Sequence, residues 1–268
     1  LPCMAVFGLP HALGLPGIAG DTRLWLAAVT IVLFTLAFRI AGRPDAFRYT
    51  LLVVASPVVA MPVALGITDP PVLAALCFAL ALLGRAGKPV WAAAFAIGVV
   101  CAMKATAWPA LPVLAAMLAA REGMRTAARF AAAALGTAVV LVIAFAPADL
   151  GRPSAMFQNT VLFPLGLTHV QTPAASPLPG HLLATLGSGG RAAAIILLIA
   201  AGLAVAVSLY VRPPTDGPAA ARRLAIGLIL LFALSPATRF GYFAYPIGLY
   251  GWLILSGTPR ERELSEPG

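Results

Sequence analysis

Three ionisable side chains stand within or beside apolar stretches, where a charge is costly. Asp69 directly precedes the apolar run 70–83, Lys104 lies in the apolar stretch 90–107, and Arg239 lies in a short turn before another apolar run. Ionisable residues in such positions usually face a cavity or a charged partner. Ammonium and guanidinium groups are good donors to phosphate oxygens. One carboxylate and two cations at helix ends therefore predict a binding site for an anionic head group.

Each of these residues also has an ordinary structural explanation. Asp69 can cap the helix that follows it, because Pro70 suits the first turn of a helix. Lys104 can extend its ammonium to the membrane interface, and Arg239 can be a lone surface arginine. Tyr242 follows Arg239 closely, and an aromatic residue in such a place is more often a membrane-belt or packing residue than a ligand contact. We nevertheless group Tyr242 with the expected phosphate-binding residues.

The composition indicates a membrane protein. The chain has 61% hydrophobic and 10% charged residues, and its mean hydropathy is +0.95. A soluble domain has about a quarter charged residues, and a folded soluble chain needs a polar surface. The net charge of +9 does not point to nucleic acid, because the basic residues fall singly or in pairs between apolar segments. We therefore expect a lipid bilayer as a partner, and no nucleic acid.

Hydropathy predicts an all-α fold. The bilayer core needs roughly 20 apolar residues per helix, and some apolar windows are shorter than that, so we expect short outer half-helices among them. The fold class is a polytopic transmembrane helical bundle of about seven to nine membrane helices. The expected windows are residues 24–41, 49–66, 70–83, 90–107, 109–120, 126–146, 192–211, 224–235 and 242–256.

Charge alternation predicts the topology. Every second connection carries arginine or lysine, and such connections usually lie in the cytoplasm. We expect one transmembrane domain over residues 1–257, with a long outer loop at 147–190 and a cytoplasmic tail at 258–268. The expected location is the plasma (inner) membrane, with the site facing outside the cytoplasm. The chain begins at Leu1 without an initiator methionine, so we also expect native sequence upstream.

Several segments resemble a known superfamily. Residues 67–71 around Asp69, 98–112 around Lys104 and 235–246 around Arg239 look like the GT-C glycosyltransferases. The likeness is closest to the actinobacterial polyprenyl-phosphate-mannose-dependent mannosyltransferases, in which segment 159–166 is also familiar. The resemblance implies a helical bundle with an extracytoplasmic active site. It also implies a polyprenyl-phosphate sugar donor and a glycolipid or glycan acceptor.

The resemblance also implies roles for individual residues. Asp69 matches an acidic position that binds the donor phosphate through a divalent cation, magnesium or manganese, or orients the acceptor. Lys104 and Arg239 match basic positions that neutralise the phosphate leaving group, and we expect Tyr242 to bind beside them. The family's catalytic base is an aspartate of the first outer loop, which we expect upstream of Leu1, so the fragment itself could be inactive. Asp21 fits a helix cap instead.

Two other functions use the same residues. A transporter or flippase of a lipid-linked or anionic solute would need an anion site but no general base. A non-catalytic membrane scaffold would need neither. The sequence contains no Walker loop, no Gly-x-Ser-x-Gly and no His-Glu-x-x-His motif.

Overall fold

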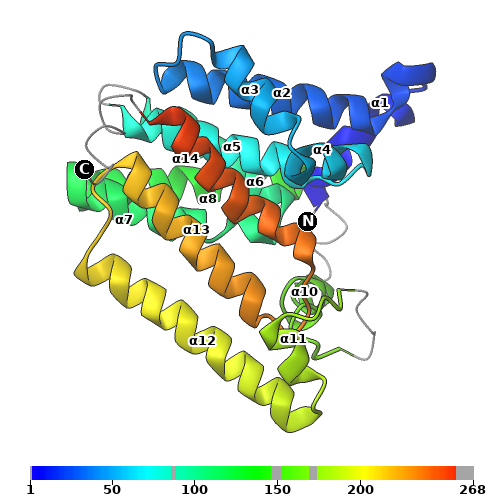
Figure 1. Cartoon of the computed structure of the whole chain (residues 1–268), viewed down its shortest axis with the longest axis vertical. Helices are drawn as coiled ribbons and strands as arrows, with labels where there is room; N and C mark the ends of the chain where they lie inside the picture. The colour runs from blue at the N-terminus through cyan, green and yellow to red at the C-terminus, as the bar shows by residue number, and fades with distance from the viewer. Residues whose placement is uncertain (1, 86–88, 146–152, 169–173, 258–268) are drawn as a thin grey trace, which may run out of the picture.

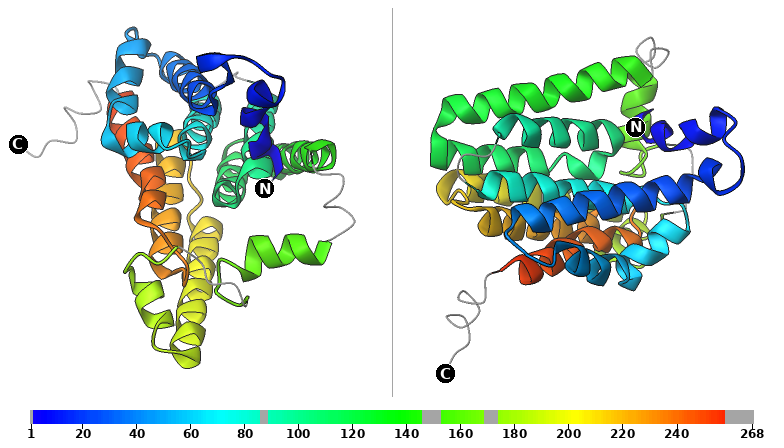
Figure 2. Two further views of the ribbon diagram at one scale, coloured as in Figure 1. Left: turned by 90° about the vertical axis from the view of Figure 1, so that its right-hand side faces the viewer. Right: turned by 90° about the horizontal axis from the view of Figure 1, so that it is seen from above.

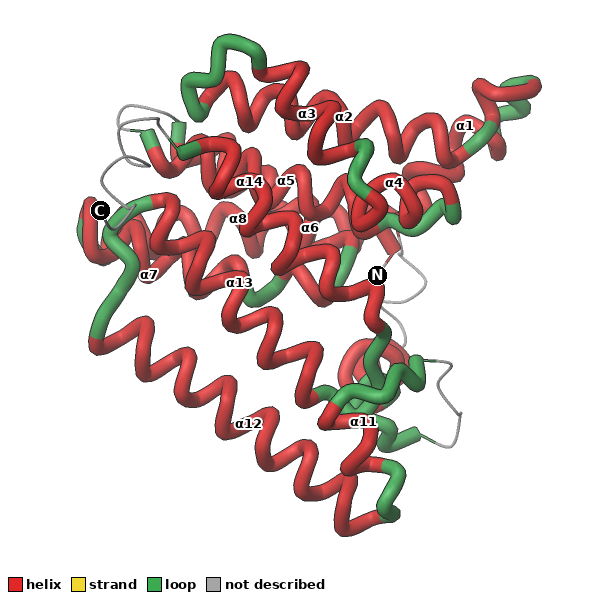
Figure 3. The backbone as a smooth tube through the Cα atoms, in the orientation of Figure 1, coloured by secondary structure: helices red, strands yellow, loops and turns green. Residues whose placement is uncertain are grey.

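The computed structural model describes residues 2–85, 89–145, 153–168 and 174–257. Within these ranges the chain is helical, and no strand is formed (Figure 3). One isolated bridge joins Ala175 to Thr238. The all-α prediction is confirmed. The expected tail at 258–268 lies outside the described residues.

Ten helices form the body of the described bundle. Four of them, α2, α8, α12 and α13, are long and apolar enough to cross a membrane alone. In chain order the ten are α2 (Thr22–Ile40), α3 (Ala46–Val54), α4 (Pro57–Ala64), α5 (Asp69–Gly84), α6 (Val90–Met103), α7 (Ala110–Glu122), α8 (Met124–Phe145), α12 (Ser188–Val211), α13 (Gly217–Leu234) and α14 (Ala244–Ser256).

Shorter helical segments accompany them at the connections. These are η1 (Pro2–Gly8), α1 (Leu9–Ala12), η2 (Gly17–Gly20), η3 (Ala105–Ala107), α10 (Pro153–Phe157), the π-helical η4 (Gln158–Leu162), α11 (Pro179–Ala184) and η5 (Phe240–Phe243).

The stretch 49–66, expected as one span, is broken. Helices α3 and α4 meet at an angle of 70°. Ser56 at the break is extended, with φ −64° and ψ 141°, because Pro57 follows it. A proline ring clashes with a helical conformation of the preceding residue, so the helix stops there and restarts at Pro57.

Helix α5 is the centre of the bundle. Nearly all of its side chains are buried, as expected for a helix that is apolar on every side. It packs against α2, α6, α13 and α14. Figure 1 shows α2 and α3 on one side of it and α12 on the opposite side, and Figure 2 shows the helices running side by side. Helix α12 is the least buried of the long helices, and it contacts mainly α11 and α13.

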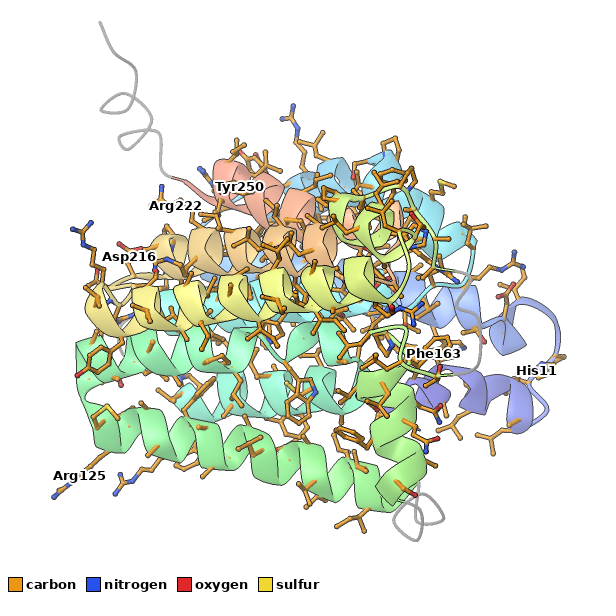
Figure 4. The ribbon with its side chains drawn as sticks, turned by 90° about the horizontal axis from the view of Figure 1, so that it is seen from below. His11, Arg125, Phe163, Asp216, Arg222 and Tyr250 are labelled. Atoms are coloured by element: carbon orange, nitrogen blue, oxygen red, sulfur yellow. The ribbon has the colours of Figure 1, made fainter. Side chains whose placement is uncertain are left out.

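Successive helices alternate in direction, which sorts the charges to two ends. Figure 4 shows Arg125 and Arg222 at one end and His11 and Phe163 at the other. We call the first the basic end, and the second the cavity end after the cavity that opens there. The described basic residues of the basic end are Arg39, Arg43, Arg48, Arg85, Arg121, Arg125, Arg129, Arg212, Arg222 and Arg223. Those of the cavity end are Arg23, Lys104, Arg191 and Arg239.

The long connection expected at 147–190 is not a structureless loop in its described part. It contains α10, η4 and α11, and α12 already begins at Ser188. Gly180 explains how closely this segment approaches the bundle, because a Cβ there would lie 2.1 Å from the carbonyl oxygen of Leu234. Only glycine fits such a contact without a backbone shift. The connection is thereby seated against the end of α13.

Candidate active site

Asp69 and Lys104 form an ion pair at the cavity end. Helices α5 and α6 run in opposite directions, and at 1.5 Å per residue they are about 24 Å and 21 Å long. Their similar lengths bring the first residue of α5 beside the residue that follows α6. The Lys104 ammonium donates a hydrogen bond to Oδ1 of Asp69. The two side chains are 19% and 7% exposed, so the pair is largely screened from solvent.

The backbone favours both charges where they lie. Asp69 occupies the first turn of α5, where the helix dipole stabilises a negative charge. Lys104 caps the C-terminus of α6, where the dipole stabilises a positive charge, and its own backbone is extended. The side-chain cap that the sequence suggested at the start of α5 is not formed. The hydroxyl of Thr68, the residue before α5, donates to Sδ of Met4 at 3.0 Å instead.

Lys104 faces a cavity of about 670 Å³. Its ammonium also lies 5.7 Å from the ring centre of Tyr242, within cation–π range. The polar part of the cavity lining holds one cation and several hydroxyls, which suit an anionic, hydroxyl-rich ligand. The lining residues with polar side chains are Lys104, Thr106, Asn159, Thr160, Ser235, Thr238 and Tyr242.

Two segments far apart in the sequence build the wall of this cavity. Thr238 is fully buried, its amide donates to the carbonyl of Ala174 at 3.0 Å, and its hydroxyl donates to the carbonyl of Phe232 at 2.8 Å. The amide of Ala237 donates to the carbonyl of Pro164 at 3.2 Å. Nδ1 of His181 lies 2.9 Å from the carbonyl of Pro236. The turn after α13 is thus fastened to the connection that precedes α12.

The structure brings together three of the four predicted site residues. Asp69, Lys104 and Tyr242 lie within one connected group. Burial, and secondarily the Asp69 carboxylate, raise the pKa of the Tyr242 phenol, whereas the nearby Arg239 acts in the opposite direction. Arg239 itself is exposed, and it is not among the residues that line the cavity. It directly follows Thr238, which is a lining residue, and we call this position beside the lining the rim.

Apart from Tyr242, the uncharged polar residues that line the cavity were not predicted from the sequence. Thr106, Ser235 and Thr238 are common residue types that give no signal in a single sequence. Asn159 and Thr160 lie in the segment 159–166, which the family resemblance singled out without assigning it a role. Their place in the same cavity lining as Lys104 follows only from the folding back of the long connection.

The described residues around Asp69 do not form a metal site by themselves. In the described part of the chain, no three His, Cys, Asp or Glu side chains come together as a group that could hold a metal ion. The Lys104 ammonium already neutralises the Asp69 carboxylate. We therefore derive no step through a metal.

Asp21 has the capping role that the sequence predicts. Its carboxylate accepts a hydrogen bond of 2.9 Å from the amide of Arg23 at the start of α2, and it pairs with the Arg23 guanidinium at 2.6 Å. These contacts with Arg23 lower the pKa of the Asp21 carboxyl to about 2. A carboxylate held in this way is a weak base.

An apolar groove lies beside the polar cavity. It has a volume of about 360 Å³ and runs between α7, α12 and α13. Leu231 lines both the groove and the cavity, so the two adjoin there. Arg223 is the only charged residue among those that line the groove within the described chain. Gly202 and Gly227 widen the groove, because neither carries a side chain.

Comparison with known protein families gave a match over most of the chain. A sequence model described as glycosyltransferase family 87 matches residues 2–236, well over half of the chain. The matched range includes Asp69, Lys104 and the segment 159–166, and it ends before Arg239 and Tyr242. No curated protein and no solved structure matched the chain.

Proposed function

From the premise that this multi-pass membrane chain belongs to glycosyltransferase family 87, we propose that its donor is a polyprenyl-phosphate sugar. We propose mannose as the sugar and a lipid or glycan as the acceptor, with transfer at the extracytoplasmic face. The transporter alternative gains no support from this family.

The observation that carries the donor class is the pairing of a polar cavity with an apolar groove. The cavity presents one ammonium and several hydroxyls, and the groove beside it is lined almost wholly by apolar side chains. A polyprenyl-phosphate sugar has the same two halves, a charged hydrophilic head and a long hydrocarbon tail. Leu231, at the boundary, would lie where the phosphate meets the tail.

The transfer requires stabilisation of a leaving phosphate. The acceptor hydroxyl oxygen attacks the anomeric carbon, the bond from that carbon to the phosphate oxygen breaks, and its electron pair stays on the phosphate. Lys104 stabilises this charge from a fixed position in a largely dry site. Arg239 at the rim attracts the anionic head group. None of the described lining residues is a carboxylate or a histidine, so the acceptor's proton passes to a base outside this set or to the departing phosphate.

Filling the groove tests this function. Gly202→Phe is expected to raise KM for a long-chain polyprenyl-phosphate mannose about tenfold, because a Cβ at Gly202 meets nothing within 4 Å and the ring would occupy the groove. A short-chain donor with the same head should be used as well as before. The measurement is radiolabelled mannose transfer by the protein in detergent or liposomes.

Gly136→Phe is the matched control, because Gly136 is exposed on α8 and also has free space around its Cβ position. An equal effect of Gly202→Phe on long and short donors would refute the tail groove. Failure of the unaltered protein to bind any polyprenyl-phosphate sugar would refute the proposed donor.

The proposed orientation can be tested with single cysteines. The native cysteines Cys3, Cys77 and Cys101 are all buried, so an added exposed cysteine should dominate labelling. In intact cells, Phe240→Cys at the cavity end is expected to react with an impermeant maleimide. Thr215→Cys at the basic end should react only after permeabilisation. The reverse result would place the site in the cytoplasm.

A further inference from the structure

We propose that Tyr245 is a positioning residue that orients the Asp69 carboxylate and, through it, the Lys104 ammonium at the cavity. This inference rests on the proposed function, because Lys104 matters only if an anionic head group binds beside it. Aromatic residues at this end of α14 otherwise suit membrane-belt or packing roles. Burial, hydrogen bonding and helix packing together set Tyr245 apart from those roles.

Tyr245 is fully buried, and it is the largest fully buried side chain of the described chain. Burying a hydroxyl without a hydrogen bond is costly, so a phenylalanine would serve better if only packing were needed. Tyr250, farther along α14, contrasts with it because its side chain is 36% exposed. The hydroxyl of Tyr245 is therefore retained in the interior for its contacts.

Those contacts link the cavity wall to the ion pair. The hydroxyl of Thr106, a cavity-lining residue, donates to the Tyr245 hydroxyl at 3.1 Å. A phenol that accepts one hydrogen bond still has its own proton to donate. The Asp69 carboxylate is a charged neighbour of the same phenol and interacts with it electrostatically. We assign the phenol proton to this carboxylate. A chain of contacts thus runs from Thr106 through Tyr245 and Asp69 to Lys104.

Helix packing fixes this arrangement. Gly248 lies one turn after Tyr245, and Leu73 lies one turn after Asp69, on helices that both start at the cavity end. A Cβ on Gly248 would lie 2.2 Å from Cδ2 of Leu73, so the two helices meet as closely as a glycine allows. Small residues permit such close approach of membrane helices. The close contact one turn below holds the phenol against the carboxylate.

The test is Tyr245→Phe, with Tyr250→Phe as the matched loss of an exposed hydroxyl from the same helix. We expect Tyr245→Phe to weaken binding of polyprenyl monophosphate about tenfold, the effect of losing one hydrogen bond to a charged group. Tyr250→Phe should leave it unchanged. The measurement is a titration of the full chain in detergent, with the melting temperature recorded for each variant.

A double-mutant cycle separates positioning from a merely structural role. If Tyr245 acts through Asp69, then Tyr245→Phe should weaken binding little further in an Asp69→Asn background. An equal loss of affinity from Tyr245→Phe in the unaltered and the Asp69→Asn backgrounds would overturn the inference. A Tyr245→Phe protein that binds polyprenyl monophosphate as well as the Tyr250→Phe protein would overturn it too. Failure of the unaltered protein to bind polyprenyl monophosphate would instead overturn the proposed function, and the inference with it.

Discussion

Replacing Lys104 with methionine is expected to lower kcat for sugar transfer about a hundredfold. The ammonium is the only cation among the described residues that line the cavity, and removing one preorganised donor from a developing anion costs roughly 3 kcal/mol. Methionine keeps the length of the side chain and removes its charge. The measurement is initial rates of mannose transfer at saturating donor and acceptor.

Arg23→Met is the matched control for this loss of charge. Arg23 lies at the same end of the bundle, its side chain is 60% exposed, and it is not among the cavity-lining residues. The Arg23→Met substitution should change kcat by no more than about twofold relative to the unaltered protein, as expected for loss of an exposed charge. A Lys104→Met protein with the kcat of the Arg23→Met protein would refute the role of Lys104 in stabilising the leaving phosphate.

Replacing Asp69 with asparagine is expected to lower the free energy of unfolding by about 3 kcal/mol, more than the other single substitutions proposed for this protein. The substitution leaves the partly buried Lys104 ammonium without a counter-ion, and an unpaired charge in such a place is worse than no charge. The double variant Asp69→Asn/Lys104→Met leaves no charge behind. It should therefore recover most of the lost stability while remaining about a hundredfold slow.

Reversible unfolding in mixed micelles, followed by circular dichroism, measures these differences. Asp21→Asn provides the exposed comparison, since its ion pair with Arg23 lies at the surface. A double variant as unstable as Asp69→Asn alone would show that Asp69 stabilises the fold through contacts other than Lys104. The interaction with Tyr245 inferred above would then be the first of these to examine.

Hydropathy and charge determined the main elements. The window 70–83 became α5 (Asp69–Gly84), and the window 126–146 became α8 (Met124–Phe145). Both signals are local, because a run of apolar residues needs a helix in lipid whatever its neighbours are. The alternation of basic connections follows in the same way from the antiparallel order of the helices. The break at Ser56 was missed because hydropathy outweighed the proline that follows it.

Only the tertiary structure decided the site. The sequence marked Asp69 and Lys104 separately, as two residues that would contact a phosphate, but their pairing depends on the matching lengths of α5 and α6. Tyr245 lies in the apolar window 242–256, and nothing in the sequence distinguished it from the other aromatic residues there. The position of that phenol depends on how closely α14 approaches α5 at Gly248, and this distance is set by which faces of the two helices meet. Local patterns fix where helices begin and end, whereas contacts between side chains distant in sequence depend on packing.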